Sequence, residues 1–477
     1  MIHRRALRGS PPLFIALFSA TVAYAGPAPD TAPGAPAAPA TAATPGESTP
    51  TSAPPPAKAR GPSLSLSQAE ELTLAHQPAL AVAAGQVEAS QGRVEEARAG
   101  YLPQIAVTGT YQRTTGNFAP RPGGLPSAVT AASWNASTYN YFNFGVAGSQ
   151  LIYDFGQTSD RWRAAAANRD AADAGRLTAR AQALLAVRRA YLQARAQVDL
   201  VAVADEAYEN QSRHLVQTQG FVRAGMRPEI DLARARTDLA NAKVQLVNAQ
   251  NGLAIAMATL NQTMGLAADR SYDLADAGLP PVAGEDAAGE GQMDGLVKRA
   301  LEARPEVANL AQQRRAQELT VRSIEGAYGP ALGATAGATE AGAQVDHLVP
   351  NWFVGLALSW PIFQGGLTRG QVREANGTLH VLSAQEQALG LQIRVDVEQA
   401  QLSIGAAKAT IEAAEEAHRN ARDQLRLAER RYETGLGSAI ELGDAQVALT
   451  TAAAQVVSAR YSLGSARAQL LAALGVP

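Results

Sequence analysis

Two copies of one long pattern fill most of the amino-acid sequence, and this duplication limits the possible folds. The segment VRAGMRPEIDLARAR at residues 222–236 matches YETGLGSAIELGDAQ at residues 432–446, an offset of 210. The same offset holds from Tyr153 to Gly265, but upstream it becomes 227 because the first copy carries 17 extra residues in a loop within 114–138. A duplicated unit of this length predicts two similar halves, not a solenoid of short repeats.

Each copy contains long stretches in which small and apolar residues recur at alternating steps of three and four. One such run is Val397, Ala400, Ile404, Ala407 and Ile411. This spacing is typical of a coiled-coil seam, although ordinary amphipathic helices on a globular core would give a similar stripe. The glycine-containing breaks at Gly225 and Gly435 predict hairpin tips. We expect helices at 157–222 and 228–265 in the first copy, at 367–432 and 438–474 in the second, and shorter helices before each strand pair, the second at about 305–328.

Alternating apolar and polar residues predict four β-strands, at about 103–114, 139–153, 330–341 and 351–363. Trp352 and Trp360 share one face, and with Phe142 and Phe144 they are candidates for the aromatic edges of an outer-membrane apolar band. A soluble β-sandwich could also show this alternation. Four strands cannot close a barrel, and an open edge in lipid leaves backbone groups unsatisfied, so the strands require other chains. Two chains would supply eight strands, and three would supply twelve.

The remaining segments indicate an exported protein. Residues 1–25 have the basic start, apolar centre and Ala-Tyr-Ala end of a secretory signal peptide. Residues 26–62 are rich in Ala, Pro and Thr and predict a disordered tether, after which we place the first repeat at 63–266, a linker at 267–292 and the second repeat at 293–477. The chain has no cysteine, which excludes disulfides and thiolate metal sites, and its net charge of −2 does not suggest nucleic-acid binding.

Together these features resemble the TolC-like outer-membrane efflux proteins over about residues 64–476. The resemblance rests on the duplicated helix–strand–strand–helix unit, the Tyr-x-Pro motifs at Tyr101 and Tyr328, and the Tyr-x-x-Gly tip beginning at Tyr432. It implies a mostly α-helical fold with a small β part: a homotrimer with a 12-stranded barrel in outer-membrane lipid and an α-helical tunnel in the periplasm. It also implies a passive exit duct for drug efflux, metal efflux or type I secretion, with a periplasmic adaptor (membrane fusion protein) and an inner-membrane transporter as partners.

The resemblance further implies a gate at the periplasmic entrance. Glu441 and Asp444 match the family's acidic rings, and Tyr432 and Asp231 match a pair that holds neighbouring coils together in the closed state. An arginine that the family can place two residues after the tip glycine is Gly437 here, which puts the latch in doubt. Without the resemblance, Glu441 and Asp444 would be read as solvated acids in the first turn of a helix, where they interact favourably with the helix dipole.

The resemblance also implies that the two tips are docking sites for the adaptor. The tip residues are Ala224, Gly225, Met226, Thr434, Gly435 and Leu436. They would also serve as plain helix–turn–helix connections, in which glycine supplies a positive φ. A soluble periplasmic coiled-coil adaptor or scaffold is the alternative function. The sequence offers no nucleophile–base set and no metal-ligand spacing, so we expect neither an enzyme nor a cofactor.

Overall fold

The computed structural model describes residues 63–115, 138–267, 270–275, 281–286 and 290–476. The expected signal peptide and tether lie outside the described residues, as do most of the loop expected after residue 114 and parts of the expected linker. The domain boundaries inferred from the sequence remain predictions.

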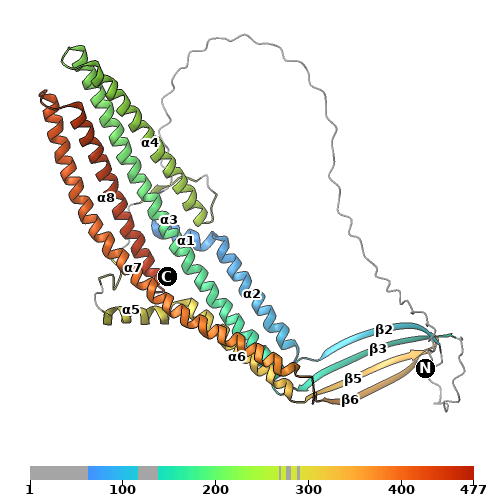
Figure 1. Cartoon of the computed structure of the whole chain (residues 1–477). Coiled ribbons are helices and arrows are strands. Elements are labelled where there is room, and N and C mark those ends of the chain that lie inside the picture. Colours follow the sequence, from blue (N-terminus) through green and yellow to red (C-terminus); the bar gives the residue numbers. More distant parts are fainter. Residues whose placement is uncertain (1–62, 116–137, 268–269, 276–280, 287–289, 477) are drawn as a thin grey trace, which may run out of the picture. The chain divides into compact units, whose positions relative to one another are not determined.

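The described residues form long helices and one four-stranded sheet (Figure 1). The helices are α1 (Leu66–His76), α2 (Pro78–Ala99), α3 (Gln157–Arg223), α4 (Glu229–Thr263), α5 (Glu290–Ala303), α6 (Pro305–Glu325), a 3-10 turn (Gly326–Tyr328), α7 (Leu367–Glu433) and α8 (Ala439–Ala473). The strands of the sheet are β2 (Gln104–Thr115), β3 (Thr138–Tyr153), β5 (Ala331–Gly342) and β6 (Val349–Ser359). Two short strands, β1 (Ser63–Leu64) and β4 (Asp273–Leu274), pair with each other in parallel.

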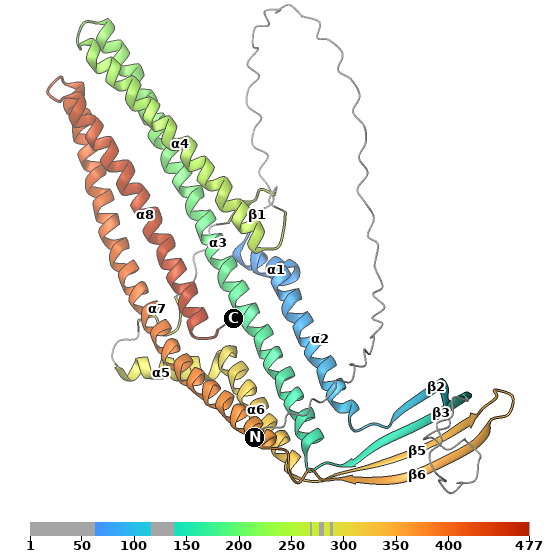
Figure 2. The ribbon, with the colours of Figure 1, turned by 45° about the vertical axis from the view of Figure 1, so that its right-hand side comes forward.

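The long helices run as two antiparallel pairs, α3 with α4 and α7 with α8 (Figure 2). The seam of the second pair buries Ile393, Val397, Ala400 and Ile404, which are all fully inaccessible. Alanine at intervening seam positions keeps the side chains short, so the helix axes can approach closely. The expected mostly helical fold with two repeats is therefore confirmed. Among the described residues, no helix combines the length and apolar character needed to cross a membrane.

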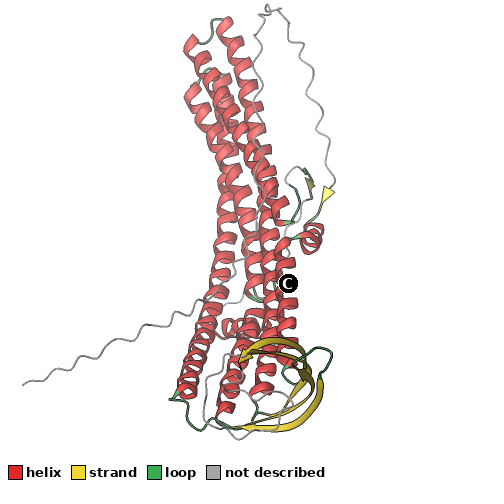
Figure 3. Ribbon diagram, turned by 90° about the vertical axis from the view of Figure 1, so that its right-hand side faces the viewer, coloured by secondary structure: helices red, strands yellow, loops and turns green. Residues whose placement is uncertain are grey.

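The sheet is antiparallel, in the order β2-β3-β5-β6 (Figure 1). Figure 3 shows its strands in yellow beside the helices in red. Its register aligns Val107 with Val146, Val146 with Ala338, and Ala338 with Trp352, so these four side chains share one face. Two residues along β6, Val354 continues the same face and is 74% exposed. The sheet therefore has one continuous apolar face that the described residues leave uncovered.

The aromatic residues expected at the membrane edges lie on this sheet or next to it. Trp352 is 75% exposed within β6, and Trp360 directly follows the strand and is 58% exposed. The indole Nε1 of Trp360 donates a 3.0 Å hydrogen bond to the Tyr328 carbonyl, which ties the strand end to the end of the helical part. Phe144 is 45% exposed, and Phe142 is half-buried beside Tyr111, with ring centroids 4.9 Å apart. Their place in a bilayer stays a prediction.

Part of the segment between the repeats is fastened to the second helical pair by Glu285. Its buried carboxylate accepts two 2.9 Å hydrogen bonds from the Arg467 guanidinium and lies 3.0 Å from Lys408 Nζ. Burial alone would raise the pKa of Glu285, but hydrogen bonds from Arg467, the Val282 N–H and Lys408 lower that pKa to about 2. The carboxylate therefore stays charged and joins this segment to α7 and α8.

Candidate gate at the ends of the long helices

The first tip joins α3 to α4 through a regular helix-ending turn. Gly225 has φ of +71°, and its N–H donates to the Val222 carbonyl, while the Met226 N–H donates to the Phe221 carbonyl at 2.9 Å. This pair of bonds satisfies carbonyls that the end of the helix would otherwise leave free, and the left-handed residue it needs is most often glycine. Pro228 then precedes α4, whose first turn contains Asp231.

The second tip joins α7 to α8 through a wider turn. Gly435 has φ of +77° and its N–H donates to the Tyr432 carbonyl, but the next bond to the helix comes from the Gly437 N–H, which donates to the Arg431 carbonyl at 2.7 Å. A Cβ atom at Gly437 would lie 2.9 Å from the Tyr432 nitrogen, so the backbone has no space for a side chain there. A side chain at this position would therefore require the turn to shift.

The six candidate docking residues lie at these two turns. Met226 is 65% exposed and Leu436 is 78% exposed, so each tip presents one large apolar side chain to solvent. Ala224 and Thr434 cap the ends of α3 and α7. Adaptor docking at these residues stays a prediction.

Tyr432 is buried between the two helical pairs, with only 1% of its surface exposed. Its ring contacts two side chains of α3: the centroid lies 5.3 Å from that of His214 and 6.2 Å from that of Phe221. Its hydroxyl lies 3.5 Å from the Thr218 hydroxyl, also on α3. Tyr432 therefore joins the second repeat to the first near the tips.

Arg227 makes the other connection across the tips, and it was missed in the sequence analysis. Its Nη2 donates to the Tyr432 carbonyl at 3.0 Å and to the Gly437 carbonyl at 3.2 Å. Its guanidinium carbon lies 4.3 Å from the centroid of the Tyr432 ring, a cation–π contact. The repeat offset aligns Arg227 with Gly437, so comparing the two tips could have revealed that the first one carries the arginine.

We call the Arg227, Tyr432 and Gly437 contact the tip clasp. It differs from the expected pairing of Tyr432 with Asp231. Within the described residues no hydrogen bond joins Asp231 to Tyr432; Asp231 is half-buried in the first turn of α4 and influences His214 electrostatically. The predicted Tyr432–Asp231 pair remains a prediction for the assembled protein.

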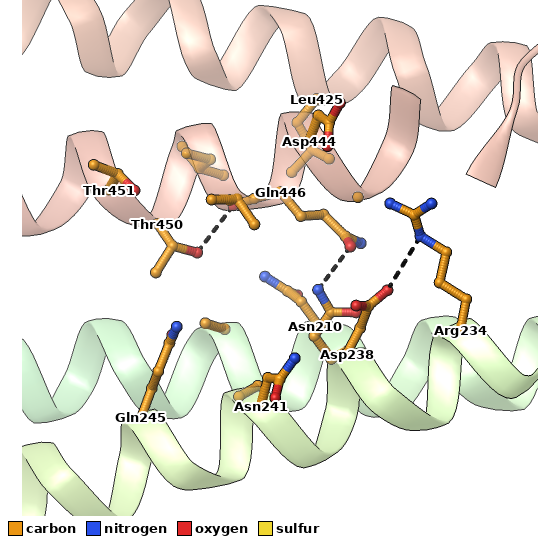
Figure 4. Close-up of a pocket in the computed structure, with 16 residues that line it drawn as sticks. Asn210, Arg234, Asp238, Asn241, Gln245, Leu425, Asp444, Gln446, Thr450 and Thr451 are labelled. Carbon is orange, nitrogen blue, oxygen red and sulfur yellow. Dashed lines mark hydrogen bonds and ion pairs between the residues drawn. The ribbon is translucent and has the colours of Figure 1, made fainter. Parts of the chain in front are cut away.

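The two acidic gate candidates lie in the first two turns of α8. Ser438 caps this helix by accepting a hydrogen bond from the Glu441 N–H at 3.1 Å, and the Glu441 carboxylate lies 3.1 Å from Arg431 Nε. Asp444 is exposed and lies at the edge of a polar cavity of about 230 Å³ (Figure 4). These positions suit both the gate and the helix-cap interpretation.

The polar cavity lies between the first helical pair and α8. Gln211 Nε2 donates to Gln446 Oε1 at 2.8 Å across it, and Arg234 Nε lies 3.8 Å from Asp238 Oδ2 (Figure 4). The two pairs are thus joined by the tip clasp at their ends and by polar contacts directly behind it. Among the described residues, no group of three or more His, Asp or Glu side chains could hold a metal ion.

The His214 ring packs against the Tyr432 ring of the tip clasp, with the centroids 5.3 Å apart. Burial lowers its pKa below the ordinary value of 6.5, and the nearby Asp238 and Asp231 carboxylates oppose that shift. The lowered pKa favours the neutral imidazole beside Tyr432 at neutral pH.

Comparison with known proteins identifies the family. The family model described as "Outer membrane efflux protein" matches residues 70–266 and 296–476, one segment for each repeat. The outer membrane protein TolC of Escherichia coli is 26% identical over 443 residues, covering 86% of this chain and 83% of TolC. TolC of Salmonella enteritidis is 24% identical over 420 residues, covering 83% and 80%.

Solved structures share the fold at lower identity. The Vibrio cholerae outer membrane protein VceC has a TM-score of 0.74 at 19% identity, covering 86% of this chain and 96% of VceC. The open state of the Neisseria gonorrhoeae MtrE outer membrane channel has a TM-score of 0.70 at 19% identity, covering 86% and 88%. The alternative of a soluble adaptor is set aside by these findings. The chain belongs to the outer membrane efflux protein family and is a non-enzymatic efflux channel of the outer membrane.

Proposed function

We propose that three copies of this chain form a 12-stranded barrel in the outer membrane and one continuous α-helical tunnel below it. The observation that carries this proposal is the four-stranded sheet. β2 and β6 each pair with only one strand in the described chain, which leaves two open edges. In hydrocarbon, unpaired backbone groups cost several kcal/mol each, so a membrane sheet has to close on itself.

The face of the sheet supports a position in lipid. Ile105 and Val107 on β2 are 73% and 80% exposed, and Leu356 on β6 is 75% exposed. The opposite face carries polar groups such as Thr108 and Asn143, as the inside of a water-filled barrel requires. Four strands fall short of the roughly eight needed to close a barrel, while three chains supply enough and match the family's trimer.

The tunnel would conduct substrates passively from an inner-membrane transporter and a periplasmic adaptor. The exposed apolar Met226 and Leu436 at the two tips are the expected contacts for the adaptor. The substrate would be selected by the transporter, so a drug, a metal ion or a secreted protein are all compatible with the duct.

The tips would also form its gate. In a trimer, Glu441 and Asp444 would place six carboxylates around one axis, where they repel one another, attract cations and disfavour anions. The tip clasp holds the two helical pairs of each chain together, because Arg227 bonds to carbonyls of the opposite tip. We expect opening to require separation of these pairs.

Oligomeric mass tests the proposal. We expect the protein to resist extraction from membranes by alkaline carbonate, to dissolve in detergent, and to have the mass of three chains by light scattering. A monomer in detergent, or release from membranes without detergent, would contradict the barrel and support a peripheral scaffold.

A further inference from the structure

The first turns of α4 and α8 occupy equivalent places in the two repeats but carry different charges. The offset of 210 aligns Asp231 with Glu441 and Arg234 with Asp444. Within each helix the two residues are three positions apart, so they lie on one face. We call Asp231 and Glu441 the first level and Arg234 and Asp444 the second level. The first level is acidic in both repeats, whereas the second pairs a base with an acid.

Arg234 and Asp444 face the same space between the helical pairs. Both line the polar cavity of about 230 Å³, Arg234 from α4 and Asp444 from α8 (Figure 4). A Cβ atom added at Gly443 would lie 3.7 Å from Arg234 Nη2, so the guanidinium reaches across to the residue that precedes Asp444. The cation of the first repeat therefore lies next to the helix turn that carries the acid of the second.

The positive charge of Arg234 is only loosely paired. In its ion pair with Asp238, one turn along α4, Nε and Oδ2 are 3.8 Å apart, which is too long for a hydrogen bond. Nε itself is buried, and among the described residues it has no hydrogen-bond partner. The side chain is 38% exposed, and ion pairs of this kind contribute little to stability. The charge is therefore available to a solute in the space between the helical pairs.

The same face of both helices is uncharged farther from the tips. On α8 it continues after Asp444 as Val447, Thr451, Gln455, Ser458 and Ser462, and the aligned residues of α4 are Thr237, Asn241, Gln245, Asn248 and Gly252. Steps of three and four keep these positions on one side of each helix. Charge selection by this face is therefore concentrated in the two levels next to the tips.

We propose that Arg234 is a selectivity-determining residue of the entrance, which lets the duct accept anionic solutes such as carboxylates as well as cations. This inference rests on the proposed trimeric duct and names the solute charge that its entrance admits. Around the axis, copies of Arg234 alternate with copies of Asp444, so the second level as a whole is neutral. Acidic rings alone would favour cations and exclude anions. With the arginines in place, the first level supplies the preference for cations, and each guanidinium offers a carboxylate a charged, forked partner.

Reversal potentials in a salt gradient measure the contribution of Arg234. Arg234→Gln removes its positive charge, so the permeability of potassium relative to chloride should rise about two- to fourfold, as expected for a charge a few ångströms from an ion in water. Arg234→Lys keeps the charge and should keep the natural ratio. An unchanged ratio in Arg234→Gln would overturn the proposal.

Glutamate as the anion tests carboxylates directly. With potassium glutamate in place of potassium chloride, natural channels should still carry an anion current. Arg234→Gln should lower the permeability of glutamate relative to potassium by about two- to fourfold. Equal glutamate permeability in the two proteins would overturn the proposed carboxylate contact.

A charge swap tests whether the two residues act at one level. Arg234→Asp alone should raise the preference for cations, and Asp444→Arg alone should lower it. The double variant Arg234→Asp/Asp444→Arg again alternates the charges around the axis, so its permeability ratio should return to within about twofold of the natural value. A double variant that keeps the ratio of either single variant would overturn the alternating level.

Arg236→Gln is the matched control. Arg236 has the same charge, lies on α4 two residues after Arg234, and is exposed on the opposite side of the helix. This variant should leave the permeability ratio unchanged. A rise as large as that in Arg234→Gln would overturn the proposal, because it would show that only the total charge near the tips matters.

The outcomes separate Arg234 from the duct itself. Natural channels that prefer cations, with a permeability ratio that ignores residue 234, would overturn this inference but leave the proposed function intact. A natural protein that gives no conductance would instead refute the proposed duct, and the role of Arg234 with it.

Discussion

The two tips descend from one sequence pattern, but they play unequal parts in the tip clasp. The first tip is tight and carries Arg227, which reaches across to the second. The second tip has the same number of residues, but its closing hydrogen bond comes from Gly437, one position later than the bond from Met226 in the first tip. It is crowded at Gly437, and it offers its carbonyls and the Tyr432 ring as the receiving surface. Duplication thus allowed one copy to become the donor and the other the acceptor of a single contact.

This inequality predicts that Tyr432→Ala lowers the stability of the tips more than the other substitutions below. Removing a fully buried aromatic side chain usually costs about 3–5 kcal/mol. Its repeat counterpart Val222 is only half-buried, so Val222→Ala should cost much less. Hydrogen exchange of the last turns of α3 and α7 measures the difference. Equal acceleration in the two variants would refute the unequal roles.

Arg227→Ala should have the next largest effect. It should lower the free energy of unfolding of the tips by about 1–3 kcal/mol, because it removes charge-assisted hydrogen bonds and a cation–π contact. Arg227→Lys keeps the charge but loses the planar fork, so an intermediate effect is expected. Limited proteolysis at the tips measures both. Arg223→Ala is the control because Arg223 is exposed at the end of α3. The same cleavage rate in Arg223→Ala and Arg227→Ala would count against the clasp.

Acid should weaken the clasp through His214. Because its pKa is lowered from 6.5, the neutral ring stabilises the folded tip fully above that value, and this stabilisation is lost as the pH falls through the lowered pKa. Cleavage at the tips should therefore increase between neutral pH and about pH 5. In His214→Gln this pH dependence should be reduced; an unchanged profile would place the titrating group elsewhere.

The ion pair between Arg431 and Glu441 should contribute least to the stability of the tips. Both side chains are about half exposed, at 57% and 42%, and such surface pairs contribute about 0–1 kcal/mol. A double-mutant cycle with Arg431→Ala and Glu441→Ala, read by tip proteolysis at low and high salt, measures the coupling. A coupling above about 2 kcal/mol would mean that the pair is shielded in the assembled protein.

The sequence predicted the parts of the fold that follow from local chemistry. The alternating steps of three and four predicted the paired helices. Gly225 and Gly435 predicted the tips, and both adopt the positive φ that such a turn requires. The four strands followed from side chains that alternate between two faces. The family resemblance and the channel function were also confirmed.

The candidate site was less accessible to sequence reasoning. Arg227 and Tyr432 are 205 residues apart, and no local period links them. Tyr432 lies at the junction of the two pairs, and its role as a latch stays a prediction. The arginine that contacts it comes from the opposite tip. The roles of Glu441 and Asp444 depend on how several copies of the chain are arranged around the tunnel axis. That arrangement is not encoded in any local pattern of a single chain.

Single-channel recording in a planar bilayer tests the gated duct most directly, with the natural protein compared to Glu441→Ala/Asp444→Ala. Glu429→Ala/Glu433→Ala is the matched control, since it removes the same charge at the same end of the molecule from exposed positions of α7. A gated duct predicts a small, cation-preferring conductance that loses its preference in the first variant and keeps it in the control. Unchanged selectivity in both variants would return Glu441 and Asp444 to solvated helix-cap acids, and a natural protein without any conductance would contradict the duct.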